Sequence, residues 1–212
     1  MRALLFANGE IADYCALTRW LRTSDHLIAV DAGARHLDAL GLQPDLVVGD
    51  LDSIDPAHLA QLRHLGVDIE QHPVAKDATD LELAIERAVQ DGATELVLLG
   101  AVGGRLDQTI ANLLILAQRS WPVPLAIAEG DQLARVLHGP QSLTLTGPAG
   151  GYVSAVALSE EVTGVTYRGL EYPLENATLH LGSTRGVSNT LASSPARISI
   201  ETGTLLVIQQ VP

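Results

Sequence analysis

Cysteine is almost absent from this chain: Cys15 is the only one among 212 residues. A single cysteine can form neither an internal disulfide nor a cysteine-based zinc site, and this usage fits a reducing cytoplasm. Positive charge is also scarce, with 13 Lys and Arg against 25 Asp and Glu and a formal net charge of −12. The chain therefore lacks the basic footprint of a nucleic-acid-binding protein and has little attraction for an anionic membrane.

Long hydrophobic runs are missing as well. No run approaches the roughly 20 residues of a membrane span, and the apolar start at residues 1–7 is too short for a signal peptide. The seven histidines show no metal-ligand spacing, and no Ser, His and Asp order indicates a hydrolase triad. With 47% hydrophobic and 18% charged residues, the chain can build a sizeable core. We expect a soluble cytoplasmic protein.

The first part of the chain alternates between strand-length apolar runs and helical spacing. This alternation predicts parallel strands with helices packed on the faces of the sheet. The expected strands are residues 3–7, 27–30, 46–48, 67–69, 96–99 and 125–128. The expected helical stripes are Leu81, Ala84, Ile85 and Ala88, and then Leu106, Ile110, Leu113, Leu114 and Ala117.

The pattern changes near residue 139, where Gly139-Pro140 is followed by a glycine-rich segment at residues 147–151. Short β-rich runs separated by turn residues follow, and they predict a small antiparallel β-sandwich of roughly 70 residues. The expected strands are residues 142–146, 152–158, 162–167, 177–181, 197–200 and 204–209.

Carboxylates follow two of the expected parallel strands. Asp50 and Asp52 alternate across Leu51, so in an extended segment both would point the same way while Leu51 packs inward. Two carboxylates placed in this way can share one Mg²⁺, which prefers one or two protein carboxylates plus phosphate oxygens. A solvated turn explains the motif equally well, because Gly and Asp are ordinary turn residues.

The second cluster, Lys76-Asp77-Ala78-Thr79-Asp80, precedes the strongest helical pattern. Thr79 and Glu82 form a capping box, which accounts for these two residues without any function. The capping box leaves Lys76, Asp77 and Asp80 unexplained, and a lysine at a strand end is well placed as a counter-charge for phosphate.

Two weaker signals lie at other strand ends. Asp31 closes a strand, where a helix N-cap is the alternative explanation. The glycine-rich turn at residues 100–104 leads into a helix and lets backbone N–H groups approach an anion. In that helix Arg105, Gln108 and Asn112 share one stripe, which is either solvated or in contact with a ligand. Because the carboxyl ends of parallel strands meet at one edge, the clusters together predict a divalent-metal and phosphate site.

In this order the motifs resemble those of the thiamine pyrophosphokinase (thiamine diphosphokinase) family, and the resemblance covers nearly the whole chain. It implies an α/β fold: an N-terminal parallel-sheet nucleotide-binding domain at residues 1–138, a small antiparallel β-sandwich domain at residues 139–212, and a homodimer. It also implies transfer of the pyrophosphoryl group of ATP to thiamine. The matching segments are Asp31-Ala32-Gly33-Ala34, Pro44-Asp45, Gly49-Asp50-Leu51-Asp52-Ser53, Lys76-Asp77-Ala78-Thr79-Asp80, Gly103-Gly104-Arg105-Leu106-Asp107-Gln108 with Asn112, Gly169-Leu170-Glu171-Tyr172-Pro173-Leu174 and Ser188-Asn189.

The resemblance implies a role for each matching residue. The Mg²⁺ ligands would be Asp31, Asp50, Asp52 and Asp80, and the catalytic residues Asp50, Asp52, Asp80, Lys76 and Arg105. Contacts to the nucleotide would come from Asn8, Gly9, Asp77, Thr79, Gly103, Gly104, Asp107, Gln108 and Asn112. Thiamine would be held by Ser188 and Asn189.

Two positions depart from the family pattern. Gln108 stands where many bacterial members have His, and a glutamine forms hydrogen bonds but cannot titrate near neutrality. Ala32 replaces the first glycine of an Asp-Gly-Gly motif. The residues alone leave open a pyrophosphokinase for another alcohol such as a hydroxymethylpterin, a non-catalytic nucleotide- or thiamine-binding regulator, and a metal-dependent phosphohydrolase. They also do not decide whether Asp80 or Asp52 accepts the proton.

Overall fold

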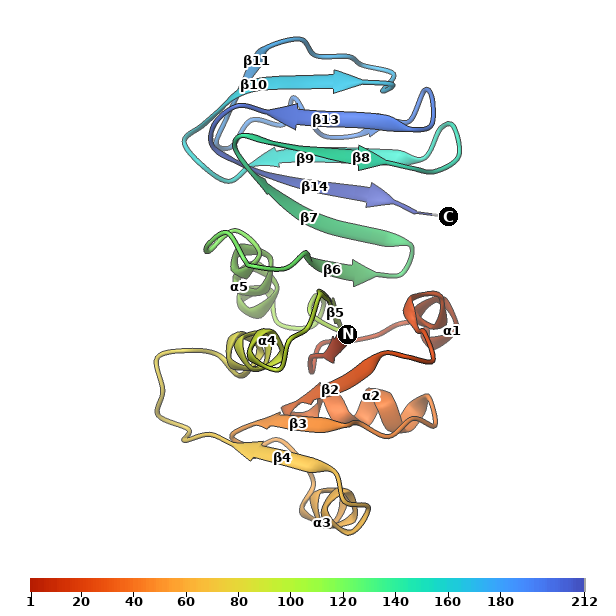
Figure 1. Ribbon diagram of the computed structural model, residues 1–212, viewed down its shortest axis with the longest axis vertical. Helices are drawn as coiled ribbons and strands as arrows, with labels where there is room; N and C mark the ends of the chain where they lie inside the picture. Colours follow the sequence, from red (N-terminus) through yellow and green to blue (C-terminus); the bar gives the residue numbers. More distant parts are fainter. Residues whose placement is uncertain (212) are drawn as a thin grey trace. The chain divides into compact units, whose positions relative to one another are not determined.

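The computed structural model describes residues 1–211, which divide into two compact units (Figure 1). The first unit comprises Met1–Ile115 and Trp121–Gly130, and the second comprises Leu116–Ser120 and the residues from 131 onward. The units divide before the expected boundary at residues 138 and 139, because the strand at residues 132–138 pairs with the last strand of the chain. That boundary stays a prediction for where independently folding domains meet.

The first unit is built on a parallel sheet with strand order β6-β5-β1-β2-β3-β4. Its strands are short and almost entirely buried, as expected of parallel strands covered on both faces. The side chains of Leu4, Leu5 and Phe6 in β1, for example, are inaccessible to solvent. The strands are β1 Arg2–Phe6, β2 His26–Val30, β3 Leu46–Gly49, β4 Asp68–Gln71, β5 Glu95–Leu99 and β6 Leu125–Glu129.

Helices connect these strands. In α4 the four residues of the expected stripe are the buried ones, and α4 packs against β1, β2 and β3. Over residues 1–211, no helix is both long and apolar enough to cross a membrane. The helices are α1 Tyr14–Leu17, α2 Ala34–Ala39, α3 Pro56–His64, α4 Asp80–Gln90 and α5 Leu106–Ile115, with 3₁₀ turns η1 Thr18–Trp20 and η2 Asp31–Gly33.

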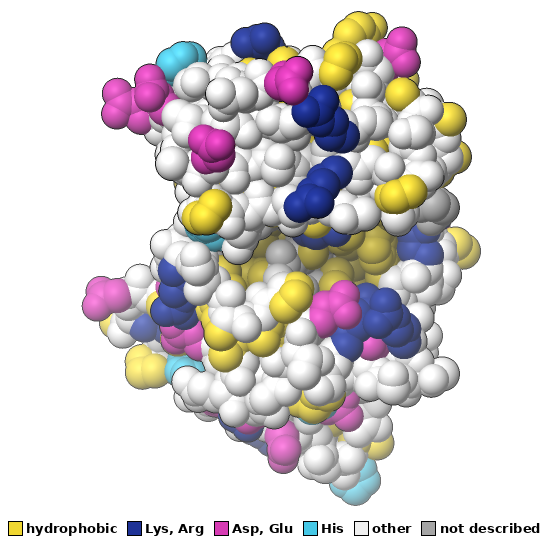
Figure 2. Space-filling model, turned by 45° about the horizontal axis from the view of Figure 1, so that its top comes forward, with side chains coloured by type: hydrophobic (Ala, Val, Ile, Leu, Met, Phe, Trp, Pro, Cys, Tyr) yellow, Lys and Arg dark blue, Asp and Glu magenta, His cyan; other side chains and the backbone are white. Residues whose placement is uncertain are grey.

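Helix α5 only partly buries the apolar stripe that its spacing predicts. Leu106, Ile110 and Leu114 are 73%, 50% and 49% exposed, whereas Asn112 is buried. Leu113 and Ala117 of the same stripe are half-buried, so the stripe is only partly covered within the single chain. Other large apolar side chains are also exposed, and the face shown in Figure 2 carries hydrophobic groups among basic and acidic ones.

The second unit consists of two antiparallel sheets, with strand orders β12-β9-β14-β7 and β11-β10-β13-β8. Its core contains fully buried side chains such as Leu145, Val165, Ile198 and Leu205. The predicted fold class is confirmed, although the sequence patterns did not reveal β7 and β12. The strands are β7 Gln132–His138, β8 Gln141–Leu145, β9 Tyr152–Ala157, β10 Glu161–Arg168, β11 Ala177–His180, β12 Asn189–Thr190, β13 Ala196–Ile200 and β14 Thr204–Gln210.

Candidate active site

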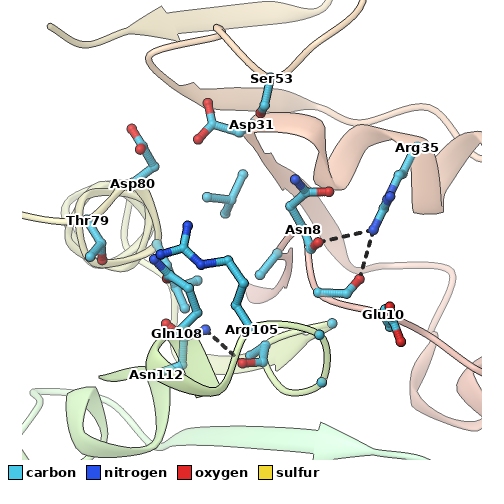
Figure 3. A pocket seen from close by; sticks show the side chains of 18 residues that line it. Asn8, Glu10, Asp31, Arg35, Ser53, Thr79, Asp80, Arg105, Gln108 and Asn112 are labelled. Carbon is cyan, nitrogen blue, oxygen red and sulfur yellow. Dashed lines mark hydrogen bonds between the residues drawn. The ribbon is translucent and has the colours of Figure 1, made fainter. Parts of the chain in front are cut away.

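A cavity of about 510 Å³ opens at the carboxyl ends of the parallel strands in the first unit (Figure 3). The chain runs outward from β1 through β2, β3 and β4, and then returns to form β5 on the other side of β1. Such a reversal leaves a crevice between the loops that follow the two neighbouring strands, and α/β proteins bind ligands there. Loops after β1, β2, β3 and β5 line the cavity, together with the first turns of α4 and residues of α5.

Three aspartates from different elements meet beside the cavity, and two of them, Asp31 and Asp80, line it. Asp31 follows β2, Asp50 follows β3 and Asp80 begins α4, and one carboxylate oxygen from each lies within 4.8 Å of the others. Hard oxygen donors at this spacing suit Mg²⁺, which uses carboxylates together with water and phosphate oxygens. The donor set therefore fits the metal that the sequence predicts.

Unusual backbone conformations bring the aspartates together. Asp31 and Leu51 both have left-handed backbone, with φ of 48° and 68°, and the Leu51 N–H donates to Asp31 Oδ1 at 3.1 Å. A Cβ on Gly49 would lie 1.8 Å from Asp31 Oδ1, so any other residue here would displace this carboxylate from its place. Asp31 does not cap a helix, because the N-cap of α2 is Gly33 and no side chain caps it.

The electrostatics of this group are unfavourable without a cation. Burial raises the pKa of Asp31 to about 7, against the lowering effect of the Leu51 N–H, and the nearby charges of Asp80 and Asp50 raise it further. Lys76 is the cation that faces the group, with its Nζ 2.7 Å from Asp80 Oδ1 and 3.4 Å from Asp50 Oδ2. One ammonium group thus faces three carboxylates, which leaves room for a bound divalent ion.

Asp52 contacts Asp50 but is not part of the group of three carboxylates that could hold a metal. The segment after β3 is a turn and not the extended strand end expected from the sequence, although Leu51 is buried as predicted. The Asp52 N–H donates to Asp50 Oδ1 at 3.1 Å, which is the main cause of the lowered pKa of Asp50. Asp52 itself is exposed, and a hydrogen bond to the Asp50 side chain raises its pKa.

The predicted capping box accounts for Thr79. Its Oγ1 accepts a hydrogen bond from the Glu82 N–H at 3.3 Å at the start of α4, and Thr79 also lines the cavity. Asp77 is exposed and does not line the cavity.

A tight loop after β1 forms the floor of the cavity beside β5. The Gly9 N–H donates to Gly100 O at 2.8 Å, and a Cβ on Gly9 would lie only 2.3 Å from that oxygen. Arg35 holds the loop from outside, because its Nη2 donates to the carbonyl oxygens of Asn8 and Gly9, each at 3.1 Å (Figure 3).

His36 supports the same loop from a fully buried position. Its Nε2 lies 2.9 Å from Gly9 O, and its Nδ1 lies 2.7 Å from the Tyr14 hydroxyl. Burial lowers the pKa of His36, with the Arg35 charge acting in the same direction. The neutral ring therefore donates to Gly9 and accepts from Tyr14.

The glycine-rich turn after β5 forms the opposite wall. Gly103 and Gly104 have φ of 89° and 68°, which other residues rarely adopt. Of the expected polar stripe, Arg105, Gln108 and Asn112 all line the cavity. Asn112 is the buried member, and its Nδ2 donates to Ala101 O at 2.7 Å.

Asp107 is turned away from the cavity. It is exposed, pairs with Arg105 at 2.6 Å and is not among the lining residues. Sequence reasoning assigned no role to three residues with polar or charged side chains that line the cavity: Glu10, Arg35 and Ser53. Their positions next to the predicted motifs were the only signal available.

The two candidate thiamine residues lie in the second unit. Ser188 has a φ of 62° and lines a hollow of about 240 Å³ with Tyr152, Ser154 and Gln210. Asn189 is buried, and its side chain bonds the backbone of Tyr172, with Nδ2 2.8 Å from the carbonyl oxygen and Oδ1 3.1 Å from the nitrogen. Ser188 therefore faces the hollow, and Asn189 holds a neighbouring loop.

Fold and site together define a class of protein. A parallel α/β unit that carries oxygen ligands for a metal and glycine turns for an anion at its strand reversal has the layout of a phosphate-transferring enzyme.

Comparisons with known proteins identify the family. Residues 17–123 match the family model described as "Thiamin pyrophosphokinase, catalytic domain", and residues 138–206 match "Thiamin pyrophosphokinase, vitamin B1 binding domain". The chain belongs to the thiamin pyrophosphokinase family, whose members are ATP-dependent diphosphotransferases. The predicted family and enzyme class are confirmed.

Individual relatives agree with this assignment. The curated thiamine pyrophosphokinase of Bacillus subtilis is 27% identical over 190 residues, which are 88% of this chain and 89% of the relative. Its crystal structure aligns with a TM-score of 0.86 at 26% identity over all of both chains. The thiamin pyrophosphokinase structure from Geobacillus thermodenitrificans aligns with a TM-score of 0.85 at 30% identity, covering 100% of this chain and 98% of the other.

Proposed function

We propose that this protein transfers the pyrophosphoryl group of ATP to the hydroxyl of thiamine, giving thiamine diphosphate and AMP. The observation that carries the proposal is the group of Asp31, Asp50 and Asp80, with Lys76. This group lies at the carboxyl ends of the parallel strands, near the point where the strand order reverses. The matches to a catalytic and a vitamin B1 binding model, one on each side of the β6–β7 turn, support the choice of substrates.

The reaction needs charge neutralisation and positioning. The thiamine hydroxyl oxygen attacks the β-phosphorus, the bond from that phosphorus to the α,β-bridging oxygen breaks, and AMP leaves with the bond electrons. Charge spreads over the phosphate oxygens in the transition state, so fixed positive charge lowers the barrier. Lys76, which contacts Asp50 and Asp80, and Arg105, which lines the cavity, supply such charge.

Mg²⁺ fits the acidic group and would add charge neutralisation and orient the phosphates. Asp31, Asp50 and Asp80 would hold it, and the exposed Asp52 would contact it through water. The hydroxyl proton passes to Asp52 or Asp80. Of these two carboxylates, Asp52 is the one without an ion pair to Lys76, whereas Asp80 lies 2.7 Å from the Lys76 ammonium group.

The nucleotide phosphates would lie against the glycine turns. Gly103 and Gly104, just before α5, line the cavity, and Asn8 and Gly9 border it from β1, so phosphates would lie against backbone there and not against bulky side chains. The Gly103 N–H itself donates to Thr109 Oγ1 at 3.1 Å. Gln108 would form hydrogen bonds to the nucleotide, and Asn112 Oδ1, which is buried and has no hydrogen-bond partner among residues 1–211, would accept one, with Thr79 bordering the opposite side. Asp77 and Asp107 would act indirectly, Asp107 by orienting the Arg105 guanidinium.

Thiamine would bind through the hollow that Ser188 lines, and Asn189 would fix the adjacent loop. We further propose that the protein is a cytoplasmic homodimer. A second copy would cover the exposed stripe Leu106, Ile110 and Leu114 of α5, which leaves apolar surface in water in a single chain.

The deciding experiment mixes the protein with Mg-ATP and thiamine and measures thiamine diphosphate and AMP. We expect equal amounts of both products, no AMP without thiamine, and at least a roughly hundredfold loss of rate in Asp50→Asn. Hydroxymethylpterin in place of thiamine tests another acceptor. Phosphate release without an acceptor, or full Mg²⁺-dependent AMP formation by Asp50→Asn, would overturn the proposal.

A further inference from the structure

Glu129 is a carboxylate to which the reaction above assigns no role. It ends β6, at the same edge of the sheet as the acidic group, and is only partly exposed. Among residues 1–211 it has no hydrogen-bond or ion-pair partner, and burial raises its pKa. An unpaired, partly desolvated acceptor at a ligand-binding edge points to a ligand that donates a hydrogen bond.

The hollow beside Glu129 suits a flat apolar ring. It has a volume of about 90 Å³, and its walls include the side chains of Ile11, Leu17, Trp20 and Leu99. The Trp20 indole is held in place, because its Nε1 donates to Gly130 O at 3.0 Å. The hollow therefore offers apolar walls with two carboxylates at its edge: Asp13, which caps α1 by accepting from the Cys15 and Ala16 N–H groups, and Glu129.

This hollow is connected to the catalytic cavity. The two share Gly100, and a shallower depression of about 550 Å³ is lined by Glu129 and Ile11 at one end and by Arg35 and Gly103 at the other. Since neighbouring strands lie about 4.8 Å apart, the three spacings from β6 to β2 place Glu129 about 14 Å from the acidic group. A nucleoside triphosphate has comparable length and would place its base at the far end from its reacting phosphates.

We propose that the hollow beside Glu129 takes the adenine ring of ATP and that Glu129 accepts a hydrogen bond from the exocyclic 6-amino group. The inference rests on the proposed function, and it assigns the residue that selects the base. Guanine carries a carbonyl oxygen at that position, which would face the carboxylate without a proton between them. A polar group left unpaired in this way produces strong discrimination between ligands.

The test compares ATP with purine riboside triphosphate, which lacks the 6-amino group, and with GTP. In the unaltered protein we expect binding of both analogues, measured by calorimetry with Mg²⁺, to be about tenfold or more weaker than that of ATP. Glu129→Ala should bind ATP and purine riboside triphosphate equally. Glu129→Gln, whose amide can also donate, should narrow the difference between ATP and GTP.

Glu160→Gln is the matched control, because Glu160 is an exposed glutamate of the second unit. It should keep the ratios of the unaltered protein. Equal binding of ATP and purine riboside triphosphate by the unaltered protein, or an unchanged ratio in Glu129→Ala, would overturn the inference. Binding is measured without thiamine, so a failure to form thiamine diphosphate would count against the proposed function and leave this result standing. If Glu129→Ala does not fold, the analogue comparison in the unaltered protein decides alone.

Discussion

At the scale of single residues, Asp31 shows how the site holds unfavourable charge. Its left-handed backbone and the glycine beside it place the carboxylate against those of Asp50 and Asp80. Left-handed backbone is uncommon for residues other than glycine, and Asp is among those that tolerate it best. The arrangement persists because the surrounding loops impose it, and strain of this kind is typical of functional sites.

The raised pKa of Asp31 predicts how stability depends on pH. Between 3.8 and about 7 the folded state holds a proton that the unfolded state releases, so the free energy of unfolding falls as pH rises across this window. Without metal at pH 8, Asp31→Asn should be more stable than the parent by about 1–2 kcal/mol, less than the full pKa difference because the carboxyl is partly exposed. Urea unfolding in EDTA at pH 5 and pH 8 measures this.

Mg²⁺ should reverse this order of stability, so that the parent becomes more stable than Asp31→Asn. The metal stabilises the folded parent by mass action, and Asp31→Asn loses one ligand. The amide oxygen that this substitution introduces would still accept the hydrogen bond from the Leu51 N–H, so the variant isolates the charge. Two results would contradict the environment assigned to Asp31. One is that Asp31→Asn is no more stable than the parent in EDTA at pH 8, and the other is that Mg²⁺ stabilises Asp31→Asn as much as it stabilises the parent.

The sequence predicted these aspartates because acidic residues follow parallel strands. It could not predict which of them meet. The two-residue period of a strand pairs Asp50 with Asp52, but the left-handed turn at Leu51 breaks that period and turns Asp50 toward Asp31. Backbone conformation at single residues depends on the whole loop, and spacing alone does not encode it.

At the scale of elements, α4 and α5 show where periodicity succeeds and where it is incomplete. The apolar stripe of α4 is buried as predicted, whereas that of α5 is only partly covered and a polar asparagine of α5 is buried. Periodicity identifies an apolar face but does not say what covers it. In α4 the cover is the sheet of the same chain, and for α5 we propose a second copy.

Thr79, at the start of α4, has two roles that substitutions can test. Thr79 caps the helix that positions Asp80 and also lines the cavity. Thr79→Ala should lower the free energy of unfolding by about 1 kcal/mol through loss of the cap, and Thr79→Ser should retain most of it. Urea denaturation with unchanged m-value measures the effect. Equal losses in both variants would show that the methyl group, and not the hydroxyl, matters.

At the scale of the whole molecule, the chain combines one unit that carries the acidic cavity with another that carries the Ser188 hollow. Sequence patterns separated the parallel from the antiparallel part, because strand–helix alternation and closely spaced turns differ in composition. They missed β7, because apolar and polar residues do not alternate regularly along Gln132–His138. This segment is a strand because it pairs with β14. Pairing between distant segments is the kind of information that a local pattern lacks.

The proposed homodimer is tested at this scale with Ile110→Asp. Ile110 is half exposed on α5, so burying the rest of its side chain against a second copy would contribute about 1 kcal/mol, while a buried unpaired carboxylate would cost more than that. Light scattering after gel filtration should give twice the chain mass of 22.4 kDa for the parent and the single mass for the variant. Leu65→Asp is the matched control, because Leu65 is equally exposed but follows α3, and it should remain dimeric. A monomeric parent, or a dimeric Ile110→Asp, would mean that α5 is not the interface between copies.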